Sequence, residues 1–241
     1  DPKEVGRRAA ENTIKRMHPK KMESCMVPVV FDPRVSKSLV STFASAISGS
    51  SVARGTSFLK EKMGEQLFDS SVTIIDNPMM KRGMASRPFD GEGIAAAPMS
   101  IVENGELQTW LLDIRTASIL GLETTGHASR GFASPPSPAS SNLYMEKGEL
   151  TPAQLIKEVG TGFYVTEAFG MGVNTTTGDY SQGAAGFWIE NGEIVFPVSE
   201  LTIAGNLKNM FKNITPASDL EFKFGTNAPS LRIEGLMVAG T

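Results

Sequence analysis

The sequence has few of the residues that most often bind metals or form cross-links. Its 241 residues include one cysteine, Cys25, and two histidines, His18 and His127. A single thiol excludes a disulfide framework and any site built from several thiolates. A zinc site needs at least three nitrogen, sulfur or oxygen donors held together, and the two histidines lie far apart in the chain. We therefore expect no metal site in this chain.

Long apolar runs and an excess of basic charge are also missing. No segment approaches the ~20 apolar residues that a membrane helix needs. The formal net charge of -3 argues against binding of nucleic acid, because contacts to phosphates need basic residues in excess. The first residues are typical of entry into a helix rather than of a signal segment, and a trimmed terminus explains this start equally well. We expect a soluble protein in a reducing, cytoplasmic compartment.

The composition predicts one folded domain with many short elements. Hydrophobic residues make up 40% and charged residues 20%, the balance of a globular protein. The 24 glycines and 14 prolines favour turns over a helix bundle. Apolar spacing predicts a helix over residues 5–17 and another over residues 39–47 that ends at Gly49. Thr151 and Gln154 form the pattern of a capping box at the start of a later helix.

The remaining signal is mainly that of antiparallel strands. Asn104-Gly105 and Asn191-Gly192 each separate two strand-like segments, and both dipeptides tolerate the positive φ of a type I′ hairpin. A proline makes the strand over residues 26–31 an edge strand. Further strands are expected at residues 72–75, 219–224 and 231–233. The predicted fold class is α+β, with a mostly antiparallel sheet or barrel-like core and a few helices near the N-terminus.

His127 is the first candidate for chemistry, because it lies in a loop of small polar residues, where functional groups tend to lie. The patterns of zinc peptidases, serine hydrolases and phosphate-binding loops are absent. A Ser-His-Asp site would need Ser129 or Ser181 with Asp113 or Asp179, and the sequence places none of these near His127. The alternative is that His127 caps a turn or binds a backbone carbonyl.

A glycine-rich segment over residues 169–197 is the second candidate. Five glycines alternate with polar residues and are followed by an aromatic strand. Glycine at strand ends lets a backbone or a ligand come close. The segment is therefore either a barrel corner that needs bends, or the lip of a sheet at which Asn174, Asp179 and Tyr180 face a groove.

Residues 172–198 carry a family resemblance. They read G-V-N-x-x-T-G-D-Y-S-x-G-x-x-G-F-W-I-E-N-G-E-I-x-F-P-V, which resembles the PmbA (TldE) branch of the TldD/PmbA family, once labelled modulators of DNA gyrase. Six further segments match in order across nearly the whole chain: residues 27–35, 54–57, 89–94, 112–116, 125–130 and 231–235.

The resemblance implies a cytosolic bacterial metallopeptidase made of two related subunits. Family members are about twice as long, so residues 1–241 resemble the C-terminal domain of a PmbA/TldE-type protein, with the N-terminal α/β domain absent from this chain. The TldD-type subunit of such a pair carries H-E-x-x-x-H just before R-G-T-S, and a cysteine near its C-terminus. Two imidazoles and a thiolate bind zinc, and the glutamate serves as general base.

This sequence departs from that metal motif. Counting back without gaps from Arg54 of R-G-T-S, the three motif positions are Val40, Ser41 and Ser45. None of these side chains replaces a metal-binding imidazole or a general base. The resemblance is therefore to the subunit without metal, with no cofactor in this chain and zinc expected in a TldD-type partner.

The resemblance further implies proteolysis of unfolded peptides together with a TldD-type catalytic subunit, in the maturation of peptide antibiotics and the degradation of antitoxin-like peptides. We expect this subunit to complete the substrate channel, with a sheet edge near the glycine-rich segment taking an extended peptide by strand addition. The expected groove or interface residues are Arg115, His127, Arg130, Asn174, Asp179 and Tyr180. Two alternatives stay open: a metal-independent hydrolase that uses His127 and a serine, and a non-catalytic binding protein or homodimer, the homodimer also being the assembly expected when the partner is absent.

Overall fold

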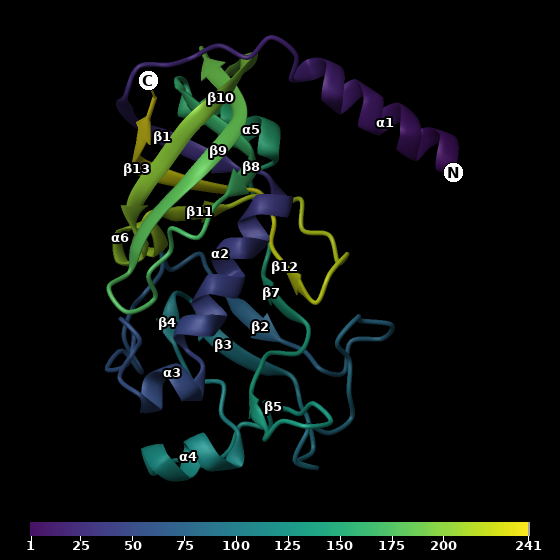
Figure 1. Ribbon diagram of the computed structural model, residues 1–241, viewed down its shortest axis with the longest axis vertical. Coiled ribbons are helices and arrows are strands. Elements are labelled where there is room, and N and C mark those ends of the chain that lie inside the picture. Colours follow the sequence, from purple (N-terminus) through teal and green to yellow (C-terminus); the bar gives the residue numbers. More distant parts are fainter. Residues whose placement is uncertain (241) are drawn as a thin grey trace.

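The computed structural model describes residues 1–240 and contains a closed five-strand barrel (Figure 1). The strands follow the order β1-β8-β9-β10-β13, and β1 pairs with β13 to close the ring. Among the strand pairs of this barrel, β1 and β8 are parallel and the others are antiparallel. A further strand, β11 (Ile214–Pro216), extends the sheet from β13. The barrel strands are β1 (Cys25–Phe31), β8 (Gly162–Phe169), β9 (Asp179–Glu190), β10 (Glu193–Asn206) and β13 (Leu231–Ala239).

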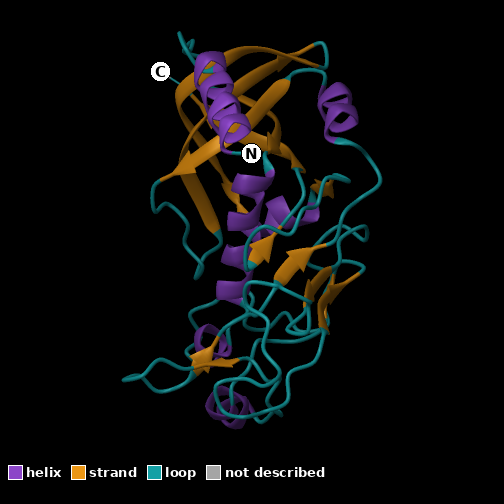
Figure 2. Ribbon diagram, turned by 90° about the vertical axis from the view of Figure 1, so that its right-hand side faces the viewer, coloured by secondary structure: helices purple, strands orange, loops and turns teal. Residues whose placement is uncertain are grey.

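A second sheet of short strands forms the other half of the molecule, which is rich in loops (Figure 2). Its order is β12-β7-β2-β3-β4, and β5 pairs with β6 separately. These strands are β2 (Ile74–Asp76), β3 (Met99–Glu103), β4 (Glu106–Leu107), β5 (Ala128–Ser129), β6 (Ser137–Pro138), β7 (Leu143–Met145) and β12 (Thr226–Asn227).

The helices confirm the predicted α+β class, although they are spread along the chain. α1 (Pro2–Lys15) has no buried residue and projects away from the barrel (Figure 1). α2 (Pro33–Ala46) runs from the barrel alongside the second sheet. The others are α3 (Gly49–Ala53), α4 (Ile114–Leu120), α5 (Pro152–Val159) and α6 (Leu207–Lys212). Within residues 1–240, every helix is too short or too polar to cross a bilayer.

Local sequence signals predicted the turns and caps correctly. Asn104 and Gly105 have φ values of 49° and 83°, and Asn191 and Gly192 have 52° and 76°. Both hairpins therefore have the left-handed turn residues that the dipeptides predicted. The capping box of Thr151 at the start of α5 is also present.

The prediction that the first strand lies at a sheet edge is wrong. β1 pairs with β13 on one side and with β8 on the other. Its pairing with β13 shifts register between Val27 and Val29, so Pro28 lies at a bulge. A bulge tolerates the missing N–H of proline, which explains a proline in an internal strand.

Two other predictions are wrong, one for the end of a helix and one for a strand. α2 ends at Ala46, and Gly49 begins α3 instead of ending the preceding helix. A Cβ atom on Gly49 would lie 2.4 Å from the Thr116 hydroxyl oxygen, so the glycine permits close packing on α4. Residues 219–224 form no strand. Asn227 of β12 holds the end of this loop: its Oδ1 accepts hydrogen bonds from the backbone N–H groups of Lys223 and Phe224.

α2 has one buried face and one exposed face. Val35, Leu39, Val40 and Phe43 are buried in a core cluster that contains residues of both sheets. Residues four apart in a helix lie on the same face. The opposite stripe of α2 is therefore free to line a surface.

Candidate functional site

The exposed stripe of α2 lines two adjoining hollows. The first has a volume of about 470 Å³ and the second about 340 Å³. Ser41, Ser45 and Thr226 line both, so the two hollows are continuous. Arg54, from the R-G-T-S segment, lines the second hollow at the end of α3. The lining of both is dominated by hydroxyl groups: Ser38, Ser41, Thr42, Ser45, Ser48, Ser50, Ser51, Ser140 and Thr226.

A larger cleft of about 860 Å³ lies at the N-terminal end of α2, between α1 and the barrel. Lys37 and Phe224 line both this cleft and the first hollow. The Lys37 ammonium lies 3.3 Å from the centroid of the Phe224 ring, a cation–π contact. The cleft and the two hollows thus form one continuous surface groove along α2, which we call the α2 groove.

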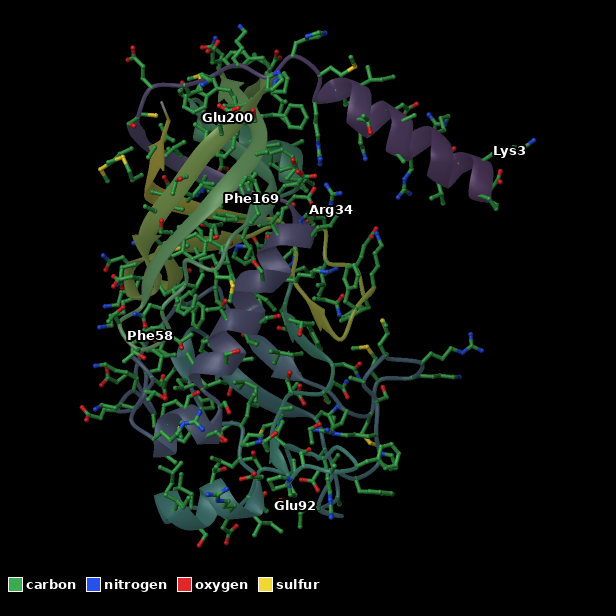
Figure 3. The ribbon with its side chains drawn as sticks, in the orientation of Figure 1. Lys3, Arg34, Phe58, Glu92, Phe169 and Glu200 are labelled. Atoms are coloured by element: carbon green, nitrogen blue, oxygen red, sulfur yellow. The ribbon has the colours of Figure 1, made fainter. Side chains whose placement is uncertain are left out.

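Asp32 organises the wall of the cleft. Its Oδ1 accepts hydrogen bonds from the backbone N–H and Nε of Arg34, and its Oδ2 accepts one from the Tyr164 hydroxyl at 3.0 Å. Arg34 lies at the start of α2, between the barrel and the second sheet (Figure 3). Burial and the negative charge of Asp32 raise the pKa of Tyr164. Tyr164 therefore stays protonated and acts as a hydrogen-bond donor, not as a base.

The three residues at which the resemblance implies the metal motif do not fit zinc. Val40 is 1% exposed and faces the core, whereas Ser41 and Ser45 are exposed and line the groove. An aliphatic side chain and two neutral hydroxyls are not the imidazole, thiolate or carboxylate donors that zinc prefers. Within residues 1–240, no cluster of three or more His, Cys, Asp or Glu side chains is arranged to hold a metal ion.

The glycine-rich segment folds into a loop and strand that satisfy their own hydrogen bonds. Asn174 Oδ1 accepts from the backbone N–H groups of Thr176 and Thr177. Asp179 accepts from the Thr177 hydroxyl and from Asn206 Nδ2, and these hydrogen bonds lower its pKa. Whether Asn174 and Asp179 also contact a peptide or a partner stays a prediction.

Tyr180 does not face a groove. It is 2% exposed within the core, and burial raises its pKa to about 12. Its hydroxyl has no hydrogen-bond partner among residues 1–240. The interpretation of this segment as a barrel corner is the one that fits its pairing.

Within this segment, β9 offers no open edge. Both edges of β9 are occupied, by β10 along its whole length and by β8 over Gly183–Ile189. The chain around Gly172 covers the remaining part, since the Ser181 N–H donates to the Gly172 carbonyl. Strand addition by a peptide therefore needs an edge other than those of β9.

Arg115, His127 and Arg130 lie around α4 and β5, at the end of the molecule away from the barrel (Figure 1). Arg115 and Arg130 are exposed, and His127 is 3% exposed. Among the described residues, none of the six predicted site residues lines the α2 groove, and they do not converge on one surface. Their role in binding a peptide or a partner stays a prediction.

His127 belongs to a buried hydrogen-bond network. Its Nε2 lies 3.2 Å from Asp76 Oδ2, and its Nδ1 lies 2.8 Å from the Thr125 hydroxyl. The backbone N–H and hydroxyl of Ser141 donate to the same Asp76 carboxylate, at 2.8 and 2.5 Å. Asp76 and Ser141 were missed from the sequence, because they lie 51 and 14 residues away from His127.

The network does not have the order of a hydrolytic triad. In such a triad the serine contacts the histidine, and the carboxylate orients the other ring nitrogen. Here serine and histidine both contact the carboxylate, and the serine is buried. Within residues 1–240, His127 makes no hydrogen bond to the predicted partners Ser129, Ser181, Asp113 or Asp179.

Asp90 lies next to this network and makes the stability of the protein depend on pH. It is 4% exposed; burial alone would raise its pKa, but the N–H groups of Ala128, Glu92 and Ile94 lower it overall. Because the folded pKa lies below the unfolded value of about 3.9, Asp90 stabilises the protein above that pH and loses this effect as pH falls through the folded pKa.

We expect Asp90→Asn to be less stable than the wild type near neutral pH, and the difference to shrink in acid. Urea unfolding followed by the fluorescence of the buried Trp110 and Trp188 measures this difference. A difference that stays constant from neutral pH down to the acid limit of folding would contradict the assignment.

Comparisons with known proteins agree with the sequence resemblance. Residues 24–240 match the family model described as the PmbA/TldA metallopeptidase C-terminal domain. The metalloprotease PmbA of Escherichia coli O157:H7 is 41% identical over 240 residues, covering 99% of this chain and 51% of that protein. The chain thus spans about half the length of the curated relatives that it matches.

Solved structures give the same result. A crystal structure of a proposed modulator of a DNA gyrase from Thermotoga maritima is 37% identical, with a TM-score of 0.89 over 99% of this chain and 55% of that chain. TldE from Thermococcus kodakarensis shares the fold, with a TM-score of 0.87 at 24% identity over 97% of this chain and 55% of that chain. The chain therefore belongs to the PmbA/TldA metallopeptidase family, and the relatives that are 41% and 39% identical to it are a metalloprotease PmbA and a PmbA homolog.

Proposed function

We propose that this chain is the PmbA/TldE-type subunit of a TldD/TldE-type peptidase in the cytoplasm, and that its α2 groove forms part of a channel for unfolded peptides. The observation that carries the proposal is that Ser41 and Ser45 line a continuous groove. The resemblance implies that the catalytic subunit type has its metal motif at these two positions. Zinc and the general base are then supplied by a TldD-type partner. Peptide antibiotic precursors and antitoxin-like peptides are the proposed substrates.

The lining of the groove supports binding of a peptide main chain. The Ser38 hydroxyl donates to the Val35 carbonyl at 2.6 Å, and the Ser45 hydroxyl donates to the Ser41 carbonyl at 3.0 Å. A hydroxyl that donates to its own helix keeps its oxygen lone pairs free to accept. Peptide N–H groups can use these acceptors whatever the side chains of the peptide, which suits a channel of low sequence selectivity.

An open strand edge beside the groove supports the same proposal. β12 is the edge strand of the second sheet, since it pairs only with β7 within the described residues. Thr226 of β12 lines both hollows along α2. We therefore move the proposed strand addition from the glycine-rich segment to β12, where a peptide can pair with the free edge.

Filling the groove tests the proposal. With Ser45→Trp, the indole occupies the hollow, and we expect kcat/KM for a peptide substrate of the complex reconstituted with a TldD-type subunit to fall about tenfold or more, which equals about 1.4 kcal/mol of lost transition-state stabilisation. Ser70→Trp, at an exposed turn outside the groove, is the matched control and should leave the rate unchanged.

Gel filtration of each complex checks that the variants still pair with the partner. Elemental analysis of the separated subunits should find zinc with the partner. Full cleavage by a correctly paired Ser45→Trp complex would show that the α2 groove is not part of the channel.

A further inference from the structure

The cleft at the N-terminal end of α2 has a surplus of positive charge. Three of its cations are ion-paired: Arg34 with Asp32, Arg16 with Glu167, and Lys223 with Glu221. Within residues 1–240, the other three cations of the cleft form no ion pair; they are Arg8, Lys15 and Lys37.

The acidic groups of the cleft are already engaged by other partners. Asp32 accepts from Arg34 and Tyr164, and Glu221 is paired with Lys223. Asp219 accepts from the N–H and hydroxyl of Ser230, each at 2.8 Å. Asp219 keeps its negative charge, and the charge of Arg8 helps to lower the pKa of Glu221. The six cations of the cleft nevertheless outnumber its carboxylates, Asp32, Asp219 and Glu221, so an anionic ligand would balance the excess positive charge.

Apolar side chains also line part of the cleft, and they help to define the class of ligand that it can bind. Ile194, Val195 and Phe224 line it and are 45%, 46% and 43% exposed. A volume of about 860 Å³ lies within the usual range of ligand sites, and apolar walls beside a few charged groups are typical of such sites. The chain as a whole carries a net charge of -3, which disfavours a nucleic-acid backbone. Carboxylate side chains interspersed with apolar ones match this surface best.

We infer that the cleft binds acidic side chains of the extended peptide whose neighbouring segment occupies the hollows along α2. The inference rests on the proposed function and adds a substrate class, namely peptides with acidic residues on one side of the segment at Ser45. From Lys37 to Ser45 the helix rises about 12 Å. An extended peptide covers this distance with about four residues. The acidic residue therefore lies about four positions from the one beside Ser45.

Binding of matched peptides tests the inference. Two fluorescein-labelled peptides of equal length differ only in that glutamates of one are glutamines in the other, and an oligothymidylate of similar length is the third probe. By fluorescence anisotropy at low salt, we expect the chain to bind the glutamate peptide about tenfold tighter than the glutamine peptide. The advantage should shrink at physiological salt, because exposed charge pairs are screened.

Variants in which glutamine replaces a lysine or arginine show which cations cause the preference for the glutamate peptide. The triple variant Arg8→Gln, Lys15→Gln and Lys37→Gln should bind both peptides equally, because the preference for glutamate is lost. Lys81→Gln removes an exposed lysine outside the α2 groove and should keep the preference for glutamate. Circular dichroism confirms that each variant is folded.

The remaining outcomes separate the inference from the proposed function. Equal binding of both peptides by the wild type overturns the acidic preference and leaves the channel in place. No binding of either peptide overturns both. Tighter binding of the oligothymidylate than of the glutamate peptide would show that the cleft recognises phosphates, and would also overturn the inference.

Discussion

Replacing Phe43 by alanine is expected to lower the free energy of unfolding by about 3–5 kcal/mol. Phe43 is 1% exposed on the buried face of α2 and packs edge-on against Phe68 and Phe211, with ring centroids 5.1 and 5.9 Å apart. Phe68 and Phe211 stack on each other at 4.5 Å. Phe211 belongs to α6, next to the barrel, and Phe68 precedes the second sheet, so the cluster joins the two halves of the molecule.

Chemical denaturation measures this loss, and an exposed phenylalanine provides the control. Phe132 is fully exposed, so Phe132→Ala should change the stability by less than about 0.5 kcal/mol. Because a stable domain has only about 5–15 kcal/mol in total, Phe43→Ala should also unfold at a clearly lower temperature. Equal stabilities of the two variants would mean that the aromatic cluster does not hold α2 in place.

Asp76→Ala is expected to destabilise the protein by a similar amount, about 3–5 kcal/mol. Asp76 is 1% exposed and receives hydrogen bonds from the N–H and hydroxyl of Ser141 while contacting His127 Nε2. Removing the carboxylate leaves these buried groups without a partner, and each unsatisfied buried group costs about 1–3 kcal/mol. The loss therefore exceeds that of a single hydrogen bond.

The exposed Asp69 is the matched control for Asp76. Asp69 accepts a hydrogen bond from the N–H of Ser71 within its own loop, and water can replace it there. Asp69→Ala should therefore cost about 1 kcal/mol or less in urea unfolding. A loss for Asp76→Ala no greater than for Asp69→Ala would show that the network contributes little to stability.

The two substitutions also bear on how the groove is built. Phe43 holds α2 from behind, and the opposite stripe of the same helix presents Ser41 and Ser45 to the groove. The Asp76 network fixes the end of β2 to the loop before β7, and β7 carries the edge strand β12. The walls of the α2 groove thus depend on contacts that lie behind them.

Much of the fold could be predicted because the relevant signals are local. Asparagine-glycine turns and the capping box of Thr151 act within four residues, so a short stretch of sequence determines them. The glycine-rich signature and the matching segments are likewise runs of adjacent residues, and they point to the family whose model matches residues 24–240. The departure at Val40, Ser41 and Ser45 is also visible in the sequence alone.

Contacts between distant segments were not predictable in the same way. Pro28 is compatible with an edge strand, but the closure of the barrel by β1 and β13 places it at an internal bulge. The sequence indicates that His127 lies in a loop, but not that this residue is buried or that it contacts Asp76. The six candidate site residues shared polar or charged character and a loop-like setting, and neither property reports which surface a residue faces.

The sequence by itself determined the family, the α+β class, and the turns and caps, because each depends on residue identity or short spacing. Only the tertiary structure decided which stripe of α2 is exposed, that three hollows join into one groove, and that β12 offers the open edge. These features depend on how segments far apart in the chain pack together, and burial and strand pairing are properties of that packing rather than of any single segment.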